Sequence, residues 1–313
     1  MERIAIFANP IAGKGKGRRI SESLRDRFTR QGWEARLVAE HPSKASAEIL
    51  QGITAAVSIG GDGTLRSVVE RVTDNAAHEG PGVLVVPMGT ANLMGRHLGV
   101  TLATKGVEER AVEMIAARRI VHLDTGVMRT CAGSSSATAD SSHVGASRLF
   151  LLMVGIGIDG AIVHALDRVR SGPIGFASYL MPAFETLTGY EYPHISVEVD
   201  GKMLWANKPG VAWAGNVKEY GTGFEILPEA RSDDGLLDVC ILPARSATDL
   251  ISHFMHAALG EHIHGEGVLY TKGQRVKVTA DRPVAIQADG DPAGFTPAEI
   301  ELTTTRVGFF SPV

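Results

Sequence analysis

Apolar residues recur with two different spacings over the first hundred positions. Arg3–Ala8 (RIAIFA) is a short apolar run that ends in the turn signal Asn9-Pro10, so it predicts a buried strand. Apolar positions four residues apart then predict a helix over 18–31. Strands are also expected over 34–40, 55–59 and 83–86, and helices over 43–51, after residue 63 and from about residue 91. Strands that alternate with helices are typical of an α/β layered domain with a parallel sheet.

From about residue 121 onwards, short strand-like runs follow one another with only two helical interruptions. Turn signals such as Asp200-Gly201, Asp234-Gly235 and Asp289-Gly290 separate them, which is typical of an antiparallel, β-rich domain. The strands are expected over 121–128, 149–155, 195–199, 211–214, 237–242, 275–279, 284–288 and 300–304. We therefore predict an α/β domain over 1–122 and a β-rich domain over 123–304, and we leave open a return of 305–313 to the first domain.

The composition limits the partners of the chain. Its 313 residues exceed the usual size of one hydrophobic core, and its formal net charge of -4 gives no general attraction for nucleic acid or anionic lipid. Cys131 and Cys240 cannot form a disulfide framework, which fits a reducing cytosol. No signal peptide is expected before the first strand, and no apolar stretch is long enough to span a bilayer. We expect a soluble, cytoplasmic protein without a nucleic-acid partner.

Three strand ends in the first domain are followed by glycine-rich turns, namely Asn9–Gly17 (NPIAGKGKG), Gly60–Thr64 (GGDGT) and Pro87–Asn92 (PMGTAN). Turns that follow parallel strands lie at one edge of the sheet, where open α/β sheets bind their ligands. Glycine lets main-chain N–H groups approach phosphate oxygens closely, and the helices that follow direct their positive dipole ends to the same edge. Together the three turns predict a cradle for a polyphosphate.

Two better-known glycine motifs do not account for these turns. The run Gly13–Gly17 has no Gly-Lys-Ser/Thr ending, so it is not a P-loop, and Arg18 stands where the third glycine of a dinucleotide fingerprint would fall. By itself this run is equally compatible with a flexible, basic turn. Asp62 lies between glycines just after an apolar strand, which suits contact with a nucleotide or metal. The alternative for Asp62 is a helix N-cap together with Thr64.

Further glycine–acid motifs follow in the second half, at 155–160 (GIGIDG), 233–238 (DDGLLD) and 289–291 (DGD). Together with Asn9-Pro10, Gly13-Lys14 and the other two turns, they resemble in order and spacing the catalytic domain of diacylglycerol and sphingosine kinases. The resemblance covers nearly the whole chain and is greatest to the bacterial soluble lipid kinases. Gly-Gly-Asp-Gly-Thr by itself is shared with NAD kinases, so it indicates only the superfamily.

The resemblance implies an ATP-dependent lipid kinase that uses Mg²⁺ and binds the nucleotide in the cleft between its two domains. Gly61, Gly63 and Thr64 would then hold the ATP phosphates, and Asp62 would help organise Mg²⁺ and the transferring phosphoryl group. The nucleotide contacts would be completed by Asn9, Lys14, Gly89, Thr90 and Asn92. Lys14 is the candidate for countering phosphate charge; a solvent-exposed lysine on a glycine turn is the alternative.

Two further acids take their roles from the resemblance. Asp289 would be the general base that accepts the proton of the acceptor hydroxyl as the new P–O bond forms. An ordinary Asp-Gly hairpin turn is the alternative for Asp289. Asp124 is a weaker candidate for an acid lining the cleft, and it could equally cap a strand end.

The segment Arg231–Leu236 (RSDDGL) resembles a loop that holds a structural Mg²⁺ in bacterial relatives. On that pattern Asp234 supplies a carboxylate, and Arg231 and Leu236 supply carbonyl oxygens, the ligands that a hard cation prefers. A polar turn before a strand is the alternative. The histidines at 253, 256, 262 and 264 have no general-base glutamate in a His-Glu-x-x-His pattern, so we favour a structural role for them.

The acceptor is the least determined part of the prediction. The apolar-rich helical stretch 160–190 either packs on the sheet or leaves a groove for the acyl chains of a lipid. Leu93 stands where members of the family often have an acid, which puts the usual electrostatics of the site in doubt.

The prediction is therefore a kinase for a lipid such as diacylglycerol or a sphingoid base, which it would meet peripherally at the inner membrane surface. The alternatives are a kinase for a soluble acceptor such as NAD, and a catalytically weak regulator that binds nucleotide or lipid. An Asn-Glu pair would be expected in an NAD kinase where this chain has Asn92-Leu93, which argues against the first alternative. The oligomeric state is open, with a homodimer as one option.

Overall fold

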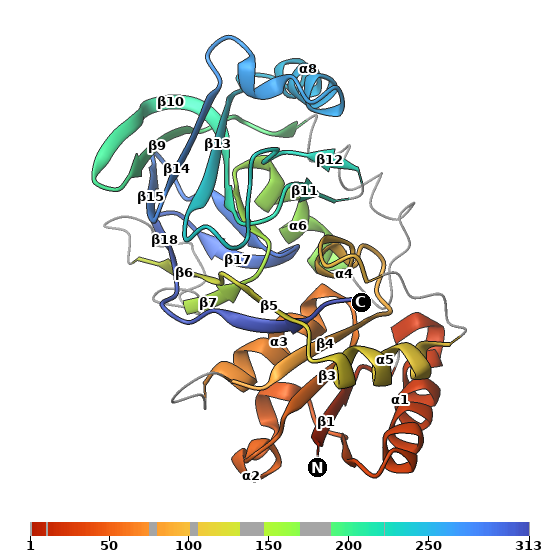
Figure 1. Ribbon diagram of the computed structural model, residues 1–313. Coiled ribbons are helices and arrows are strands. Elements are labelled where there is room, and N and C mark those ends of the chain that lie inside the picture. The colour runs from red at the N-terminus through yellow and green to blue at the C-terminus, as the bar shows by residue number, and fades with distance from the viewer. Residues whose placement is uncertain are drawn as a thin grey trace. The chain divides into compact units, whose positions relative to one another are not determined.

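The structure, a computed structural model, describes residues 2–10, 12–74, 80–100, 106–131, 147–169, 189–221 and 223–312, without the side chains of Lys14 and Val169 (Figure 1). The chain separates into two units. Unit 1 comprises Met1–Leu123 and the returning segment Thr305–Val313, and unit 2 comprises Asp124–Thr304. Each unit has its own sheet.

Unit 1 contains the parallel sheet that the alternating pattern predicts. Its strands are β1 (Arg3–Ala8), β2 (Glu34–Val38), β3 (Ala55–Gly60), β4 (Gly82–Pro87), β5 (Ile120–Leu123) and β19 (Val307–Phe310). They lie in the order β2-β1-β3-β4-β19-β5, and every neighbouring pair is parallel except β19 with β5. β3 and β4 are buried almost throughout, which is typical of parallel strands covered on both faces.

Helices alternate with these strands along the chain. They are α1 (Ala12–Arg30), η1 (Pro42–Lys44), α2 (Ala47–Leu50), α3 (Asp62–Thr73), α4 (Leu93–His97) and α5 (Val107–Ala117). The apolar stripe of α3 is buried, namely Leu65, Val68, Val69 and Val72. α1 and α5 pack against each other. α3 is therefore an amphipathic helix whose apolar face is buried, as its sequence period predicts.

Two helical regions of unit 1 differ from the sequence prediction, one in its first residue and one in its continuity. α1 begins at Ala12 rather than near residue 18, and Gly13 and Gly15 have φ of 58° and 86°. Only glycine adopts such angles easily, so the glycine run forms irregular first turns of the helix instead of a separate loop. The helix expected over 43–51 is divided into η1 and α2 because Ala45 and Ser46 between them are extended.

Unit 2 is antiparallel and β-rich. Its strands are β6 (Gly126–Thr130), β7 (Ser147–Phe150), β8 (Met153–Ile156), β9 (His194–Val199), β10 (Lys202–Gly215), β11 (Glu219–Tyr220), β12 (Phe224–Glu225), β13 (Leu237–Pro243), β14 (Leu269–Gly273), β15 (Arg275–Ala280), β16 (Ala285–Ala288), β17 (Asp291–Phe295) and β18 (Ala298–Leu302). The main sheet runs β17-β16-β8-β10-β9-β15-β18-β6-β7, and β13 and β14 continue from β10. β10 bends visibly in Figure 1, because its first half pairs with β9 and its second half with β8 and β13.

Two runs that look like single strands in the sequence are each two strands. The run 121–128 is divided into β5 and β6, because the chain passes from unit 1 to unit 2 after Leu123. The run 149–155 is divided into β7 and β8, and the N–H groups of Leu151 and Leu152 at the break bind the Asp289 carboxylate. The first break falls at the polar pair Asp124-Thr125, whereas the second falls at Leu151-Leu152 and leaves the apolar run intact, so the apolar pattern alone did not reveal the second.

The core of unit 2 lies on both faces of β10. Val211 and Trp213 belong to one apolar cluster, and Ala212 and Ala214 belong to the other, as the alternation of side chains along a strand requires. The first cluster also contains residues of the helices α6 (Ile158–Val169) and α8 (Ala247–Ala258). A short helix, η3 (His262–His264), follows α8.

Candidate active site

The three glycine-rich turns of unit 1 leave adjacent strands of one sheet. Asn9 follows β1, Gly61 follows β3 and Met88 follows β4, and these strands are neighbours in the sheet order. All three strands are parallel, so their carboxyl ends share one edge. The turns therefore meet at that edge, as a polyphosphate cradle requires.

Main-chain contacts join the three turns. The Gly13 N–H donates to the Met88 carbonyl at 3.1 Å, and the Met88 N–H donates to the Gly60 carbonyl at 2.7 Å. A Cβ added to Gly89 would lie 2.6 Å from the Cα of Gly61, closer than real Cβ atoms approach a backbone atom. Glycine at position 89 is therefore required for the second and third turns to come this close.

Asp62 is the first residue of α3, and its carboxylate binds the N-terminal end of α4. Oδ2 accepts a hydrogen bond from the Leu93 N–H, and Oδ1 accepts one from the Met94 N–H, both at 3.1 Å. Burial raises the pKa of Asp62 because it penalises the charged form, while the hydrogen bonds from Met94 and Leu93 act in the opposite direction. A largely enclosed acid thus lies among main-chain N–H groups, at the edge where the turns meet.

The two residues flanking this acid in the motif also begin α3. Gly61 is the N-cap residue of the helix and has no side chain to cap it, and Asp62 is the first helical residue. Thr64 lies against Gly60, where an added Cβ would come within 2.4 Å of the Thr64 hydroxyl oxygen. Gly63 accepts a hydrogen bond from the Ser67 hydroxyl through its carbonyl at 3.2 Å. Each of the three predicted phosphate-binding residues is therefore in the first turn of α3 or immediately before it.

Asn92 closes the third turn. It adopts the left-handed conformation with φ of 51°. Its Oδ1 accepts a hydrogen bond from the Gly89 N–H at 2.7 Å, and its Nδ2 donates to the Gly89 carbonyl at 2.8 Å. Gly89 and Thr90 are exposed. Leu93 contacts Asp62 through its N–H, so this contact does not depend on which side chain stands at position 93.

The first turn contributes its main chain to the same edge. The Asn9 N–H donates to the Ile59 carbonyl at 2.9 Å, and the Asn9 carbonyl accepts a hydrogen bond from the Ala12 N–H at 3.1 Å. The side chain of Lys14 lies outside the described residues, so its predicted contact with phosphate stays a prediction. Arg18 is exposed and pairs with Glu22 at 3.1 Å within α1, as expected of a solvated basic rim.

In unit 2, Asp289 forms the turn of the β16–β17 hairpin. Asp289 and Gly290 have φ of 51° and 80°, as a tight hairpin turn requires. The carboxylate bends back onto the chain between β7 and β8. Oδ2 accepts a hydrogen bond from the Leu151 N–H at 2.8 Å, and Oδ1 accepts from Leu152 and Met153 at 2.8 and 3.2 Å. Asp289 therefore forms the ordinary hairpin turn that the sequence offers as the alternative. Its carboxylate is in addition held by three main-chain N–H groups.

A second buried acid, Asp159, begins α6 and is 3% exposed. It accepts hydrogen bonds from Trp213 Nε1 at 3.1 Å, from Gln287 Nε2 at 2.9 Å and from the Tyr220 hydroxyl. Burial raises the pKa of Asp159, and the three donors act against this. Sequence reasoning did not single out Asp159 as a site residue. A signal was present, because in the GIGIDG motif an acid follows a strand and precedes a glycine, as Asp62 does in Gly-Gly-Asp-Gly-Thr.

Gln287 links this buried acid to the turn of the β16–β17 hairpin. Its Nε2 donates to Asp159, and its Oε1 accepts a hydrogen bond from the Gly290 N–H at 2.8 Å. The side chain is 2% exposed. Asp289 is therefore held on one side by the N–H groups of the β7–β8 connection, and its turn is held on the other by Gln287.

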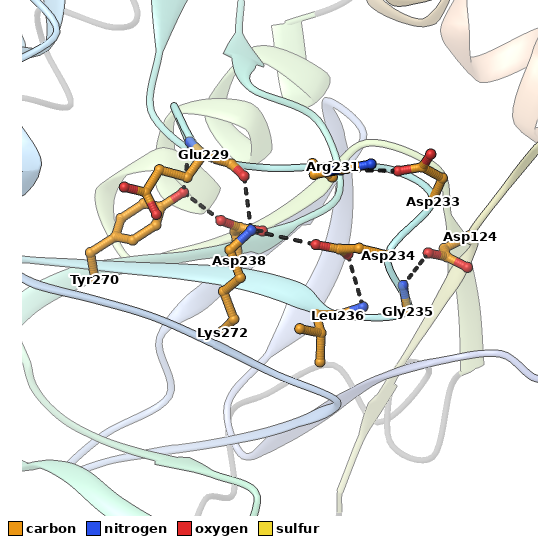
Figure 2. Close-up of polar contacts among 10 residues, drawn as sticks. All are labelled: Asp124, Glu229, Arg231, Asp233, Asp234, Gly235, Leu236, Asp238, Tyr270 and Lys272. Atoms are coloured by element: carbon orange, nitrogen blue, oxygen red, sulfur yellow. Dashed lines mark hydrogen bonds and ion pairs between the residues drawn. The ribbon is translucent and has the colours of Figure 1, made fainter.

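Arg231–Leu236, the segment with the predicted metal ligands, forms a charged loop that immediately precedes β13 in the sequence. Figure 2 shows the polar contacts of this loop. Asp234 Oδ1 accepts a hydrogen bond from the Leu236 N–H at 3.1 Å, and Arg231 Nε pairs with Asp233 at 3.3 Å. Asp124, between β5 and β6, contacts this loop, because its Oδ2 accepts a hydrogen bond from the Gly235 N–H at 2.8 Å. Across the described part of the chain, no three His, Cys, Asp or Glu side chains are grouped so as to hold a metal. The Mg²⁺ site at Arg231, Asp234 and Leu236 stays a prediction.

The histidines near α8 have main-chain partners. His253 Nε2 lies 2.9 Å from the Pro243 carbonyl, His256 Nδ1 lies 2.8 Å from the Ser252 carbonyl, and His262 Nε2 lies 3.0 Å from the Ile226 carbonyl. These contacts agree with the structural role that the sequence favours for them.

Two family models match the chain. The diacylglycerol kinase catalytic domain matches residues 3–128, and the YegS C-terminal NAD kinase beta sandwich-like domain matches residues 152–309, half of the chain. The chain belongs to the diacylglycerol kinase family. The predicted family and the predicted fold class are thus confirmed, and membership of this family makes the chain a kinase. Neither match determines the acceptor.

Relatives are similar over nearly the whole chain. A diacylglycerol kinase of Bacillus subtilis (strain 168) is 26% identical over 96% of this chain and 93% of the relative. A diacylglycerol kinase of Staphylococcus carnosus (strain TM300) is 23% identical over 99% and 95%. A crystal structure of a diacylglycerol kinase from Bacillus anthracis str. Sterne has the same fold, with a TM-score of 0.70, 19% identity, and coverage of 99% and 97%. Among the described residues, no helix has the length and apolarity that crossing a membrane requires.

Proposed function

We propose that this chain is an ATP-dependent lipid kinase that transfers the γ-phosphate of ATP to the hydroxyl of a lipid such as diacylglycerol or a sphingoid base. The observation that carries the proposal is the meeting of the three turns at one sheet edge, with Asp62 among main-chain N–H groups. The names of the relatives support a lipid acceptor.

In this proposal the turns bind the triphosphate. Main-chain N–H groups around Gly61, Gly63 and Thr64 contact the phosphate oxygens, and Lys14 counters their charge. Asn9, Gly89, Thr90 and Asn92 complete the nucleotide contacts. Mg²⁺ bound with ATP neutralises charge on the phosphate oxygens, and Asp62 would hold it. One carboxylate together with substrate phosphates is a usual Mg²⁺ environment, so the residues present fit.

Asp289 is the proposed general base. The acceptor oxygen attacks the γ-phosphorus, the bond from phosphorus to the ADP oxygen breaks, and the hydroxyl proton passes to the Asp289 carboxylate. The N–H groups of Leu151, Leu152 and Met153 fix the orientation of this carboxylate. Because Gln287 holds the same turn, we propose it as a positioning residue.

A pocket of about 290 Å³ in unit 2 supports a lipid acceptor. Ala161 and Ala165 of α6 and Phe295 of β17 provide apolar walls, Arg168 adds a positive charge, and Arg282 pairs with Glu191 at 2.6 Å within the same lining. The pocket adjoins the Ala285–Phe295 end of the hairpin whose turn contains Asp289. Such a combination of apolar walls and polar side chains suits an apolar chain with a polar head. Residues 170–188 of the stretch expected to bind acyl chains lie outside the described part.

The test is transfer of labelled phosphate from ATP, with Mg²⁺, to a panel of diacylglycerol, a sphingoid base, ceramide, phosphatidylglycerol and NAD. Lipids are presented in mixed micelles, and Asp289→Asn protein is the control. Labelled lipid is the expected product. Transfer to NAD alone would remove the lipid acceptor, and ATP binding without any transfer would favour a regulator. A vesicle sedimentation assay would test the peripheral membrane contact of this cytoplasmic protein, and light scattering would test the homodimer.

A further inference from the structure

The loop 229–238 of unit 2 surrounds the ammonium group of a lysine. Lys272 Nζ donates a hydrogen bond to the Glu229 carbonyl at 2.8 Å, and it lies 3.2 Å from Asp238 Oδ2 and 3.5 Å from Asp234 Oδ2 (Figure 2). One carbonyl and two carboxylate oxygens thus contact a single positive charge. Such oxygen atoms are also those that a hard divalent cation prefers, and Asp234 is the one residue that this set shares with the Mg²⁺ site expected at Arg231, Asp234 and Leu236.

The register of β13 and β14 brings Lys272 next to Asp238. Asp238 of β13 and Lys272 of β14 are direct partners in the antiparallel ladder, so their side chains stand side by side on one face. The Asp238 side chain is 0% exposed, and the Tyr270 hydroxyl donates to its Oδ1 at 2.6 Å. A buried carboxylate is strongly unfavourable without a positive partner. Lys272, whose side chain is 28% exposed, supplies that partner.

The other charges of the loop have partners as well. Asp234 uses Oδ1 for the Leu236 N–H and Oδ2 for Lys272. Arg231 pairs with Asp233. A divalent ion bound by Asp234 would share this carboxylate with an ammonium that lies 3.5 Å from its Oδ2, and like charges at such short range repel each other strongly.

We propose that the Lys272 ammonium supplies the positive charge that the carboxylates of the loop 229–238 require, and that the loop keeps its conformation without a divalent metal. The proposal differs from the Mg²⁺ site expected at Arg231, Asp234 and Leu236. Because Gly235 of the loop binds Asp124, the ammonium also stabilises the start of unit 2. The proposal does not rest on the proposed kinase reaction, and its test uses neither nucleotide nor lipid.

The experiment measures the thermal midpoint of the full chain in EDTA and in millimolar Mg²⁺. We expect the same midpoint in both buffers for the wild type and for Asp234→Asn. Lys272→Met should lower the midpoint by about 5 °C or more, because it leaves Asp238 buried without its cation. The matched control is Lys277→Met, which changes an exposed lysine on the next strand whose ladder partners are Glu198 and Glu299, and it should lower the midpoint by less than about 2 °C.

A double variant keeps the test usable if Lys272→Met fails to fold. Asp238→Asn together with Lys272→Met removes both charges and should be more stable than Lys272→Met alone. A midpoint of the wild type that rises with Mg²⁺, and a loss of this rise in Asp234→Asn, would overturn the proposal in favour of a metal-binding loop. Equal midpoints for Lys272→Met and Lys277→Met would overturn it too.

Discussion

Carboxylates in two regions of this kinase have different partners, main-chain N–H groups in one region and a lysine ammonium in the other. At the turn edge of unit 1, the partners of the Asp62 carboxylate are the main-chain N–H groups of Leu93 and Met94. In the loop 229–238 of unit 2, the carboxylates of Asp234 and Asp238 lie against the Lys272 ammonium. N–H groups orient a carboxylate and leave its charge in place, whereas an ammonium cancels that charge.

This difference separates acids that can act on a ligand from acids that stabilise the fold. A carboxylate held by dipoles can still attract a metal–nucleotide complex or accept a proton. Asp289 resembles Asp62 in this respect, since three main-chain N–H groups hold it. Asp62 and Asp289, the proposed active-site acids, and Asp234 of the loop all precede glycine in the sequence, so the partner in space, and not the dipeptide, distinguishes them.

The largest expected effect is that of Asp289→Asn. An amide cannot accept the hydroxyl proton, so turnover should fall by about a hundredfold or more. The measurement is the initial rate with saturating ATP and diacylglycerol, with the thermal midpoint as the check on folding. A wild-type rate would mean that another group takes the proton, and Asp289 would then belong with the structural acids.

Asp62→Asn should reduce turnover by a similar factor of about a hundred, because the charge that organises Mg²⁺ with ATP is lost. The Mg²⁺ concentration for half-maximal rate should rise as well, which distinguishes this variant from Asp289→Asn. Asp74→Asn is the control, since Asp74 is exposed at the other end of α3. An unchanged Mg²⁺ dependence would contradict the assignment.

Gly89→Ala should weaken ATP binding by about tenfold or more. The new Cβ would clash with the Gly61 backbone and separate the second and third turns. Calorimetry or a fluorescent ATP analogue measures the dissociation constant. Gly189→Ala is the matched control, because no atom of the described residues would lie within 4 Å of a Cβ at Gly189. Wild-type affinity in Gly89→Ala would show that the turns need not touch to bind nucleotide.

Gln287→Leu should lower kcat by about tenfold and leave the affinity for ATP unchanged, because the turn of Asp289 loses its hydrogen bond to Gly290. If Gln287 acts through Asp289, combining the substitution with Asp289→Asn should add little. Fully additive losses in the double variant would instead give Gln287 a separate role.

The smallest effect concerns pH. Burial lowers the pKa of His262, and the nearby His253 and His264 add to this, against the hydrogen bond to Ile226. The unfolded chain therefore binds a proton that the folded chain does not. As pH falls below the ordinary histidine value of about 6.5, stability should decrease by less than about 1 kcal/mol from this group. Urea unfolding of wild type and His262→Gln at pH 7.5 and 5.5 tests this, and identical pH dependence of the two would contradict it.

The sequence by itself determined the fold class and the position of the three turns. Apolar periods of two kinds identified β1 to β4 and the helices α1 and α3, because burial of one helix face or of a whole strand leaves a local pattern, but they did not identify α5 or β19. The same patterns missed β14 and β17, and they merged β5 with β6, since an apolar run does not show which sheet its halves join.

Only the tertiary structure decided which partner each acid has. The contacts of Asp62 with residues 93 and 94, of Asp289 with residues 151–153 and of Asp238 with Lys272 all join positions distant in sequence. Strand order and register create these contacts, and neither can be predicted from a short segment of the sequence. A motif therefore indicates where an acid stands, and the fold determines whether its charge remains available.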